Sequence, residues 1–458
     1  MKRKWCGWIL VAVIVLMTGL TACGQKGTSG KLTAASGGAG EGNDLQSEKD
    51  GEENEDINWY ANKDNAYEKL ETYDEEKDMD KNFLVQKKMD GTTVQRFYIK
   101  DLYELYRVTD QWIYYCVYRD DDMDADNCRL SEVWRVPIEK KADGDHPDLG
   151  KKELLLSMYH MTDLCVMDPY IYYLGGEDEE ESGKMTLYRY DTETKQSVPV
   201  MDGKELEEAA FVWRKQEEKG PLMLQGQLFL ADEHSLYSIE ADSGAWKQIY
   251  HDRQELLDIL SSGREIERCG GYIYFTPDNK QIYRYGGNDE KAERVLSGDA
   301  VQAKLEEISL WGEKGQDGEG GIYGIMAYQG RLYLDVAVSW TQKMRLKLSE
   351  AAEAEEGGKE ADWRCTRTIL LSTAGDSGEL TYESAVSDYF EKHAKYVSQD
   401  KWEEKVHNED SSIYILNEKE ILLSCNQSRY FNSPVYAAYD PATKKIRKVT
   451  KEEAGDEQ

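Results

Sequence analysis

The sequence lacks the short motifs that mark common catalytic and metal-binding sites. It contains no P-loop, GxGxxG, HExxH or GxSxG, and therefore gives no indication of phosphate, dinucleotide, zinc-protease or esterase chemistry. No CxxC pair or cysteine–histidine cluster has zinc-site spacing, and the six histidines are scattered singly, which disfavours a zinc centre. The sequence does not decide whether two carboxylates are paired for glycoside hydrolysis, because its 89 acidic residues place acids at every spacing.

Basic residues are also scarce relative to acids. The chain has 57 Lys and Arg against 89 Asp and Glu, for a formal net charge of −32. This charge disfavours nucleic-acid binding, because the affinity for nucleic acid depends on neutralising phosphates with Lys and Arg. A surface lying flat on anionic lipid is disfavoured for the same reason. Solubility by self-repulsion explains the charge more simply than a site for cations or basic polymers.

The apolar run near the N-terminus is too short to span a membrane comfortably. Ile9 to Leu20 is apolar and follows the basic residues 2–4, as in an export signal. The run ends in Leu20-Thr21-Ala22-Cys23, which resembles the lipobox of bacterial lipoproteins. That resemblance implies cleavage before Cys23 and attachment of diacylglycerol to its sulfur. An uncleaved anchor with an ordinary cysteine is the alternative, and both predict an exported, tethered protein.

Composition divides the rest of the chain. After a signal peptide at 1–22, residues 23–58 are rich in Gly, Ser, Ala, Asn and acids and predict a disordered tether. A charged lead-in (59–80), a repeat region (81–450) and an acidic tail (451–458) follow.

Six cysteines beyond Cys23 permit disulfides in an exported protein. Cys116 with Cys128 across one hairpin is the local bridge worth testing.

Aromatic residues are skewed toward amphipathic rings, with 31 Tyr and 11 Trp against 7 Phe, which suits half-buried strands. A hydrophobic-aromatic strand core recurs, each time after a turn signal. The cores are Trp112–Tyr115, Tyr170–Tyr173, Gln227–Leu230, Tyr272–Phe275, Arg331–Leu334 and Ile421–Ser424. The first five recur at intervals of 45 to 59 residues and the sixth follows after 90, which fits two units or one unit with an insertion.

A second strand with an aromatic at its second position follows most cores. These strands are Val133–Val136, Leu187–Tyr190, Leu236–Ile239, Ile282–Tyr285 and Val435–Ala438, and Leu105–Val108 fits ahead of the first full unit. Polar turns such as 191–195 and 440–444 lead into a further strand. The unit is thus a four-stranded meander, and we expect Tyr188, Tyr237, Tyr283 and Tyr436 to share one buried register.

This repeat predicts an all-β fold, a β-propeller of six or seven four-stranded blades. Residues 83–85 with 97–99 supply strands for a seventh blade. A solenoid or a pair of β-sandwiches is the rival, since alternation alone does not force closure. Val386, Tyr389, Phe390, His393 and Val397 follow helical spacing and predict one helical insertion at about 383–405.

The strings VTDQWIYYCVY with EVWRVPIEK, and DPYIYYLGG with TLYRYDTETKQ, resemble the β-propeller domains of unknown function in surface lipoproteins of Gram-positive bacteria, distant relatives of the YWTD propeller. The resemblance covers roughly residues 80 to 450 at the level of the repeat. It implies an extracytoplasmic interaction or sensing scaffold and carries over no catalytic residues. The YWTD tetrapeptide itself is absent.

Two segments have the residue types of a site without its full pattern. Asp120, Asp122, Asp124 and Asp126 alternate in a hairpin loop, as calcium ligands do, but Ala125 and Ser131 stand where a calcium loop needs Gly and Glu; we expect a solvated acidic hairpin. Residues 375–378, Gly-Asp-Ser-Gly, resemble a protease nucleophile loop, but no histidine motif precedes them. We expect a turn between strands at 369–371 and 380–382.

The sequence therefore predicts a lipid-anchored, extracytoplasmic propeller that acts as a binding scaffold without catalysis. The alternative is a propeller hydrolase acting on glycans or peptides at the cell surface. The expected partners are the membrane, through the lipid on Cys23, and an envelope protein or glycan. We expect no nucleic acid and no cofactor; Asp120, Asp122, Asp124 and Asp126 are the weak candidate ligands for calcium.

Overall fold

The computed structural model describes residues 60–454 with gaps at 63–64, 75–78, 89–90, 100–101, 124–128, 140–147, 160, 176–183, 202–205, 215–219, 253–255, 261–262, 309–314, 346–359, 376–377, 394–409, 418, 427–433 and 452. The signal peptide, Cys23 and the tether lie outside these residues. The chain divides into two units, residues 1–55 with 448–458, and residues 56–447. The second unit holds the sheets described below, apart from Lys448, the last residue of the last strand. No helix among the described residues is long and apolar enough to cross a membrane.

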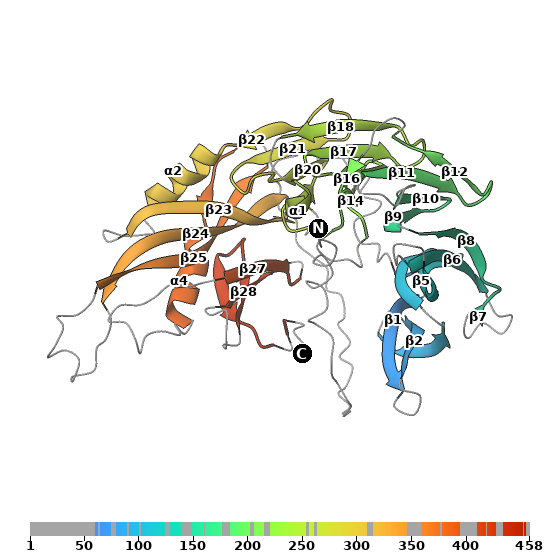
Figure 1. Cartoon of the computed structure of the whole chain (residues 1–458). Helices are drawn as coiled ribbons and strands as arrows, with labels where there is room; N and C mark the ends of the chain where they lie inside the picture. The colour runs from blue at the N-terminus through green and yellow to red at the C-terminus, as the bar shows by residue number, and fades with distance from the viewer. Residues whose placement is uncertain are drawn as a thin grey trace, which may run out of the picture. The chain divides into compact units, whose positions relative to one another are not determined.

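The first half of the described chain forms four antiparallel sheets in chain order (Figure 1). Sheet 1 contains β1 (Asn65–Asp74), β2 (Met79–Lys88) and β3 (Thr93–Tyr98). Sheet 2 contains β4 (Leu102–Val108), β5 (Trp112–Met123), β6 (Arg129–Glu139), β7 (Asp148–Leu149) and β8 (Glu153–Met158). Sheet 3 contains β9 (Met161–Met167), β10 (Tyr170–Gly175), β11 (Lys184–Asp191), β12 (Gln196–Pro199) and β13 (Leu206–Glu207). Sheet 4 contains β14 (Ala210–Phe211), β15 (Met223–Leu224), β16 (Gln227–Ala231), β17 (Ser235–Glu240) and β18 (Trp246–His251).

Three four-stranded sheets follow. Sheet 5 contains β19 (Ile266–Cys269), β20 (Tyr272–Phe275), β21 (Ile282–Gly286) and β22 (Glu293–Leu296). Sheet 6 contains β23 (Gly315–Tyr328), β24 (Arg331–Arg345), β25 (Glu360–Ala374) and β26 (Thr381–Tyr382). Sheet 7 contains β27 (Asp410–Ile415), β28 (Ile421–Asn426), β29 (Val435–Asp440) and β30 (Lys445–Lys448). Each strand pairs with the next along the chain in sheets 5 to 7, so these sheets are plain meanders.

Consecutive antiparallel meanders are the blades of a β-propeller. First strands of successive sheets also contact one another, as β4 contacts β9, β9 contacts β14, and β23 contacts β27. The predicted all-β propeller is therefore confirmed, and the described residues give seven sheets, within the predicted six or seven. Sheet 1 begins at Asn65, earlier than the expected boundary at residue 81, because Tyr67 packs in the same core as Leu84.

The predicted strand cores are the second strands of the sheets, in β5, β10, β16, β20, β24 and β28. The predicted partners lie in β6, β11, β17, β21 and β29. One assignment was wrong: Leu105–Val108 was matched to the strands that follow a core, but it belongs to β4, the first strand of sheet 2. Val108 pairs with Ile113 across the turn at 109–111, so the short turn makes this strand the partner of β5.

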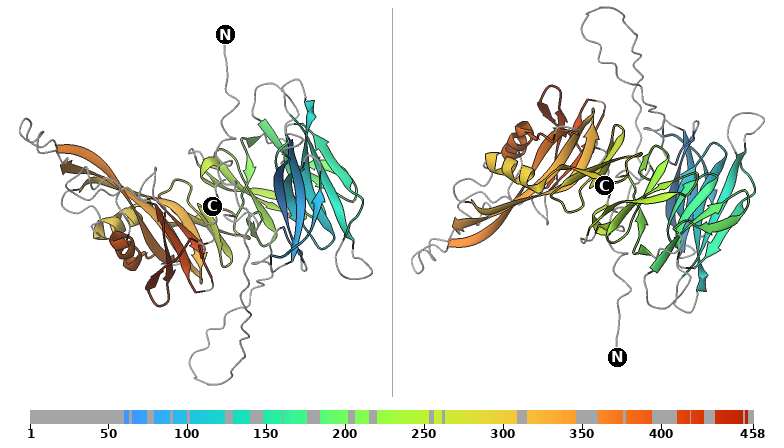
Figure 2. Two further views of the ribbon diagram at one scale, coloured as in Figure 1. Left: turned by 90° about the horizontal axis from the view of Figure 1, so that it is seen from below. Right: turned by 90° about the horizontal axis from the view of Figure 1, so that it is seen from above.

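The long interval before the last core is one sheet with an insertion. Its helix, α4 (Ser384–His393), confirms the predicted helical insertion; residues 394–405 of that prediction lie outside the described part. The sequence did not predict α1 (Leu257–Leu260) or α2 (Gly298–Ile308). Two helices lie beside the long strands of sheet 6, α2 against β23 and α4 against β25 (Figures 1 and 2).

The four tyrosines expected in one register do share it. Their partners are Tyr173, Leu230, Phe275 and Ser424, each the fourth residue of a strand core. Their expected burial was wrong for three of them: Tyr237 is fully buried, but Tyr188, Tyr283 and Tyr436 are half-buried. The buried register is two residues further on and contains Tyr190, Ile239, Tyr285 and Ala438. These residues pair with the central aliphatic residue of each core, such as Ile171 and Ile273.

The hydrophobic core lies between neighbouring sheets. One cluster joins Cys165 and Tyr172 of sheet 3 to Phe211 and Leu228 of sheet 4, and another joins sheets 2 and 3 through Tyr114 and Ile171. The large buried tyrosines pack between the sheets, and each ring can bury about 150–250 Å² of surface.

Candidate interaction surface

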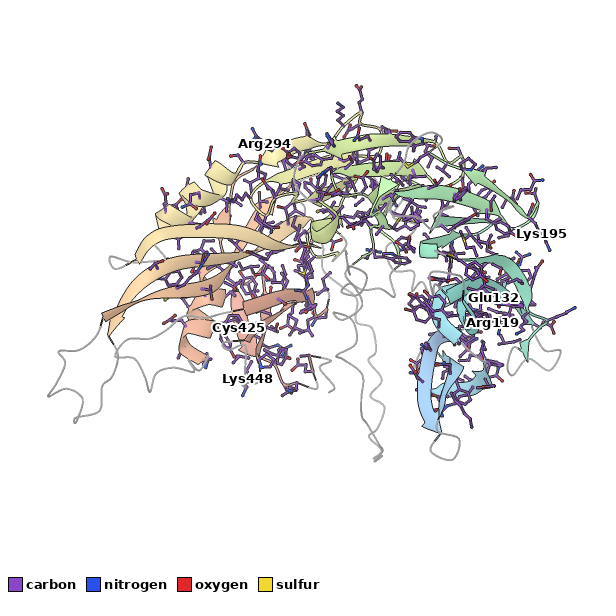
Figure 3. The ribbon with its side chains drawn as sticks, in the orientation of Figure 1. Arg119, Glu132, Lys195, Arg294, Cys425 and Lys448 are labelled. Atoms are coloured by element: carbon purple, nitrogen blue, oxygen red, sulfur yellow. The ribbon has the colours of Figure 1, made fainter. Side chains whose placement is uncertain are left out.

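In a meander, the turn between the first and second strands and the turn between the third and fourth strands lie at the same end, because successive strands alternate in direction. We call this end of each sheet its turn end. In sheet 3 it carries residues 168–169 and 191–195. Lys195, in the second of these turns, is labelled in Figure 3.

Three sheets carry the same arginine–aromatic pair at the turn end. The guanidinium carbon of Arg135 lies 4.1 Å from the ring centroid of Trp112 in sheet 2. The corresponding distances are 4.6 Å for Arg189 over Tyr170 in sheet 3 and 4.8 Å for Arg284 over Tyr272 in sheet 5. These are cation–π distances. The aromatic residue is the first of each strand core.

Strand register explains why the pair recurs. Arg135 pairs with Tyr114, Arg189 with Tyr172, and Arg284 with Tyr274. Each arginine therefore lies diagonally across from the aromatic residue two positions earlier on the same face, within reach of a long side chain. The sequence signal is an aromatic-Ile-Tyr core followed by an aromatic-Arg dipeptide. The sequence alone does not show that the two parts of this signal form a pair.

Polar partners fix the guanidinium groups. The Nη2 atom of Arg135 lies 2.9 Å from the Glu153 carboxylate, which also binds Lys195 of sheet 3 at 2.6 Å. The bond from Lys195, with that from Arg135, holds the pKa of Glu153 below its ordinary value. Arg189 donates to the carbonyl of Asp242 in sheet 4 at 2.7 Å. The pairs thus also connect successive sheets.

Buried tyrosine hydroxyls make further links at the turn end. The Tyr114 hydroxyl donates to Asp168 of sheet 3 at 2.7 Å, and the Tyr172 hydroxyl donates to the carbonyl of Ala241 in sheet 4 at 2.7 Å. Burial raises the pKa of Tyr172 to about 12, so this phenol stays a neutral donor across the ordinary pH range. The turn ends of sheets 2 to 4 are therefore held in a defined arrangement.

Aromatic surface is exposed beside these links. Tyr272 is 36% exposed and Trp246, at the start of β18, is 38% exposed; Trp112 and Tyr170 are partly exposed. This arrangement offers aromatic ring edges, guanidinium N–H groups and turn carbonyls to a ligand. Groups of these kinds are suited to recognising and orienting a partner, and none of them is a nucleophile.

The structure tests the other predicted sites only in part. Cys23 lies outside the described residues. Asp120 and Asp122 lie on the extension of β5, where its pairing with β6 shifts register between Arg119 and Met123, while Asp124 and Asp126 lie outside the described part. Within that part, no three His, Cys, Asp or Glu residues are placed to hold a metal ion. Cys116 is a free thiol, and Cys128 is not described.

The turn expected at the Gly-Asp-Ser-Gly segment stays a prediction, because Asp376 and Ser377 lie outside the described residues. The strands around it pair as β25 and β26, with Leu371 opposite Tyr382. Gly378 has φ +62°, and a Cβ on Gly375 would collide with the Tyr274 hydroxyl of sheet 5. Both glycines thus have packing or turn roles.

Sheet 4 brings together a serine, a histidine and an aspartate that the sequence did not single out. Ser235 Oγ lies 3.1 Å from His251 Nδ1. The Asp232 carboxylate, however, accepts the backbone N–H of Ser235 and the hydroxyl of Tyr237, both at 2.7 Å, rather than an imidazole N–H. Ser235 is 3% exposed. A catalytic triad needs an accessible serine and a carboxylate that orients the histidine, so this cluster stabilises a turn.

Comparison with known proteins yields structural likeness alone. No family model matches the chain, and no curated protein does. The β-propeller domain of the trilobed protease from Pyrococcus furiosus is 10% identical, with 85% of this chain and 93% of that chain covered and a TM-score of 0.35. Pyrococcus horikoshii acylaminoacyl peptidase is 11% identical (83% and 56% covered, TM-score 0.34), and Porphyromonas gingivalis dipeptidyl peptidase 4 is 10% identical (84% and 50% covered, TM-score 0.36). The chain thus spans about half the length of these two peptidases. Its own sheets define its class, an all-β propeller.

Proposed function

We propose that this protein is a lipid-anchored, extracytoplasmic β-propeller that binds a protein or glycan of the cell envelope through the turn ends of sheets 2 to 5, and that it performs no catalysis. The observation that carries the proposal is the arginine–aromatic pair repeated in sheets 2, 3 and 5, beside the exposed ring of Trp246.

Two properties of these pairs favour binding. Aromatic side chains and arginine are the residue types enriched at the energetic centres of protein interfaces. The guanidinium of Arg284 is also held at 2.5 Å by Glu293, and a side chain already fixed in place loses less entropy when a partner binds. The surface is therefore organised before a partner arrives.

The anchor is supported by the sequence. The basic residues 2–4, the short apolar run and Leu20-Thr21-Ala22-Cys23 have the order of a lipoprotein signal. The long polar segment at 23–58 leaves room between a lipid on Cys23 and the first strand of sheet 1. A net charge of −32 disfavours contact of the propeller with anionic lipid headgroups, which suits a protein that faces away from the membrane.

Binding to fractionated cell envelopes tests the proposal. We expect the double variant Trp246→Ala with Tyr272→Ala to lose most of the binding that the wild-type protein shows to a protein or a glycan fraction. Tyr323→Ala is the matched control, because Tyr323 is 53% exposed but lies on β23 in sheet 6. Equal binding by all three proteins would contradict the proposal. Release of peptide or sugar products by the wild-type protein would favour the hydrolase alternative.

A further inference from the structure

Sheet 1 is one strand short of the other sheets. It has three strands in the order β1–β2–β3, whereas each of sheets 2 to 7 has at least four. The strand β1 contacts β4, the first strand of sheet 2, as first strands of neighbouring sheets do elsewhere in the chain. This contact makes β1 the first strand of its sheet and β3 the third. Among the described residues β3 pairs with β2 alone, so its outer edge is unpaired.

The backbone of β3 offers hydrogen-bonding groups along this edge. The Ile99 N–H, just beyond β3, donates to the Asn82 carbonyl of β2 at 3.2 Å. Backbone groups of successive residues alternate between the two edges of a strand in an antiparallel pair. Tyr98 and Arg96, one and three residues before Ile99, therefore turn their N–H and C=O groups toward the unpaired edge. An edge of this kind can accept a further strand.

The face of sheet 2 that packs on sheet 1 extends beyond β3. Phe97 of β3 and Trp134 of β6 pack in the same cluster between the two sheets. Leu154 of β8, the next strand outward in sheet 2, pairs with Trp134 and so lies on the same face. Leu154 is 41% exposed. A strand added to β3 would lie opposite β8 and would cover this leucine.

Polar partners fix the indole ring on this face. The Trp134 Nε1–H donates to the Glu132 carboxylate at 2.9 Å, and the Nη2 atom of Arg119 lies 2.8 Å from the same carboxylate; Figure 3 labels Arg119 and Glu132. The ammonium nitrogen of Lys152, an exposed residue, lies 4.6 Å from the ring centroid of Trp134. The face thus offers fixed apolar surface with a cation at its rim.

The edge itself is basic, although the chain has a formal net charge of −32. Arg96 on β3 and Lys88 at the end of β2 are both exposed, and neither has an ion-pair partner among the described residues. The acid nearby on β1, Glu68, is already paired with Lys87 at 2.7 Å. A second copy of the same edge would bring like charges together across the new pair, which disfavours it. An acidic segment complements these charges.

We propose that the outer edge of β3, with Leu154 and Trp134 opposite it, binds an extended segment of a partner protein that alternates apolar and acidic residues. The segment pairs with β3 as the fourth strand of sheet 1. Its apolar side chains pack on Leu154, and its acidic side chains, on the other face, reach Arg96. Main-chain hydrogen bonds supply affinity and alternate side chains supply specificity in this mode of recognition. The surface belongs to sheet 1 and the outer part of sheet 2, and it acts independently of Trp246 and Tyr272.

Titration calorimetry of the full chain with two synthetic peptides tests the proposal. We expect a peptide that alternates valine and glutamate to bind. A peptide that alternates valine and lysine is expected to bind at least about tenfold more weakly, because like charges across an interface oppose binding. Leu154→Ala is expected to weaken binding of the acidic peptide about fivefold, since apolar contact area is lost. Val198→Ala is the matched control, because Val198 is 44% exposed but lies on β12 of sheet 3, and we expect it to bind like the wild type.

Two variants at one position test the backbone contact. Arg96→Ala removes the charge and keeps the N–H, whereas Arg96→Pro removes both; proline is tolerated on an edge strand where the N–H faces solvent. We expect Arg96→Pro to bind the acidic peptide about fivefold more weakly than Arg96→Ala, because one main-chain hydrogen bond is lost. If Arg96→Pro does not fold, the two peptides and Leu154→Ala decide without it.

Three results would overturn the proposal: no binding of either peptide, equal binding of both, or equal affinity of Leu154→Ala and the wild type for the acidic peptide. Equal affinity of Arg96→Ala and folded Arg96→Pro would also overturn it. Dimerisation of the wild-type protein that Arg96→Pro abolishes would identify a second copy as the occupant and would refute the assignment to a partner protein.

Discussion

The Lys444 ammonium group lies 2.5 Å from the carboxylate of Glu383, and this contact joins the last turn of sheet 7 to the residue that precedes α4. Glu383 is 3% exposed. It also accepts the hydroxyls of Ser372 and Tyr439, each at 2.6 Å. The inserted helix, sheet 6 and sheet 7 therefore share one buried acid.

Glu383→Ala is expected to lower the free energy of unfolding by about 2–4 kcal/mol, because the buried hydroxyls of Ser372 and Tyr439 lose their acceptor. Urea denaturation measures the change. Glu193→Ala, in an exposed turn of sheet 3, is the control and is expected to stay within about 0.5 kcal/mol of the wild type. A cost for Glu383→Ala as small as that of the control would show that the network contributes nothing.

The environment of Glu383 also predicts that the stability of the protein depends on pH. Although burial alone would raise it, the bonds from Lys444, Ser372 and Tyr439 together bring the pKa of Glu383 below its ordinary value. Stability from a lowered pKa is present above the unfolded pKa, about 4.3, and is lost as pH falls through the folded value. We expect melting temperatures measured between pH 6 and pH 3 to fall less steeply for Glu383→Gln than for the wild type. Parallel curves would contradict the assignment.

Cys23→Ala tests the anchor. Only the thiol of Cys23 can take the diacylglycerol, so the variant is expected to leave the membrane fraction or to keep its signal segment. Labelling of cells with a radioactive fatty acid, followed by recovery of the protein, reports this directly. Equal labelling of the wild type and Cys23→Ala would refute the lipoprotein interpretation.

Burial, rather than register, predicts the cost of truncating these tyrosines. Tyr237→Ala and Tyr285→Ala remove fully buried rings and are expected to cost about 3–5 kcal/mol each. Tyr188→Ala removes a half-buried ring that stacks on Tyr173 at 5.2 Å, so we expect a clearly smaller loss. Denaturant midpoints of the three variants give the comparison. An equal loss of stability in Tyr188→Ala would contradict the prediction that burial of the ring sets the cost.

Gly375→Ala probes the packing between sheets 5 and 6. The added Cβ would meet the Tyr274 hydroxyl, and Tyr274 is 3% exposed, so the ring has little room to move. We expect a loss of about 1–3 kcal/mol, as for other overpacked sites. Tyr274→Phe removes the hydroxyl and is expected to recover part of that loss in the double variant. Additive costs in the double variant would argue against the collision.

The repeat was predictable because each strand core carries its own local signal. Alternation and a preceding turn signal identified β5, β10, β16, β20, β24 and β28 without knowledge of their partners. Leu105–Val108 was assigned to the wrong place because a strand with the same aromatic pattern fits either side of a turn. Burial of Tyr188, Tyr283 and Tyr436 was overestimated, since sequence spacing gives the register of a residue but not how closely the next sheet approaches it.

The candidate interaction surface was harder to predict. The arginine–aromatic pair joins residues on different strands, so it becomes visible only once Arg189 is known to lie opposite Tyr172.

The links at the turn end also bear on how such a chain can change in length. Tyr114, Arg189 and Lys195 each reach only a turn or strand end of the adjacent sheet. Sheet 3 accepts one such link at Asp168 and donates another from Tyr172, so a whole unit is the piece of chain that carries both halves of a link. Copying of one whole unit would repeat both halves together, and the matching arginine–aromatic pairs in sheets 2 and 3 fit such a copy.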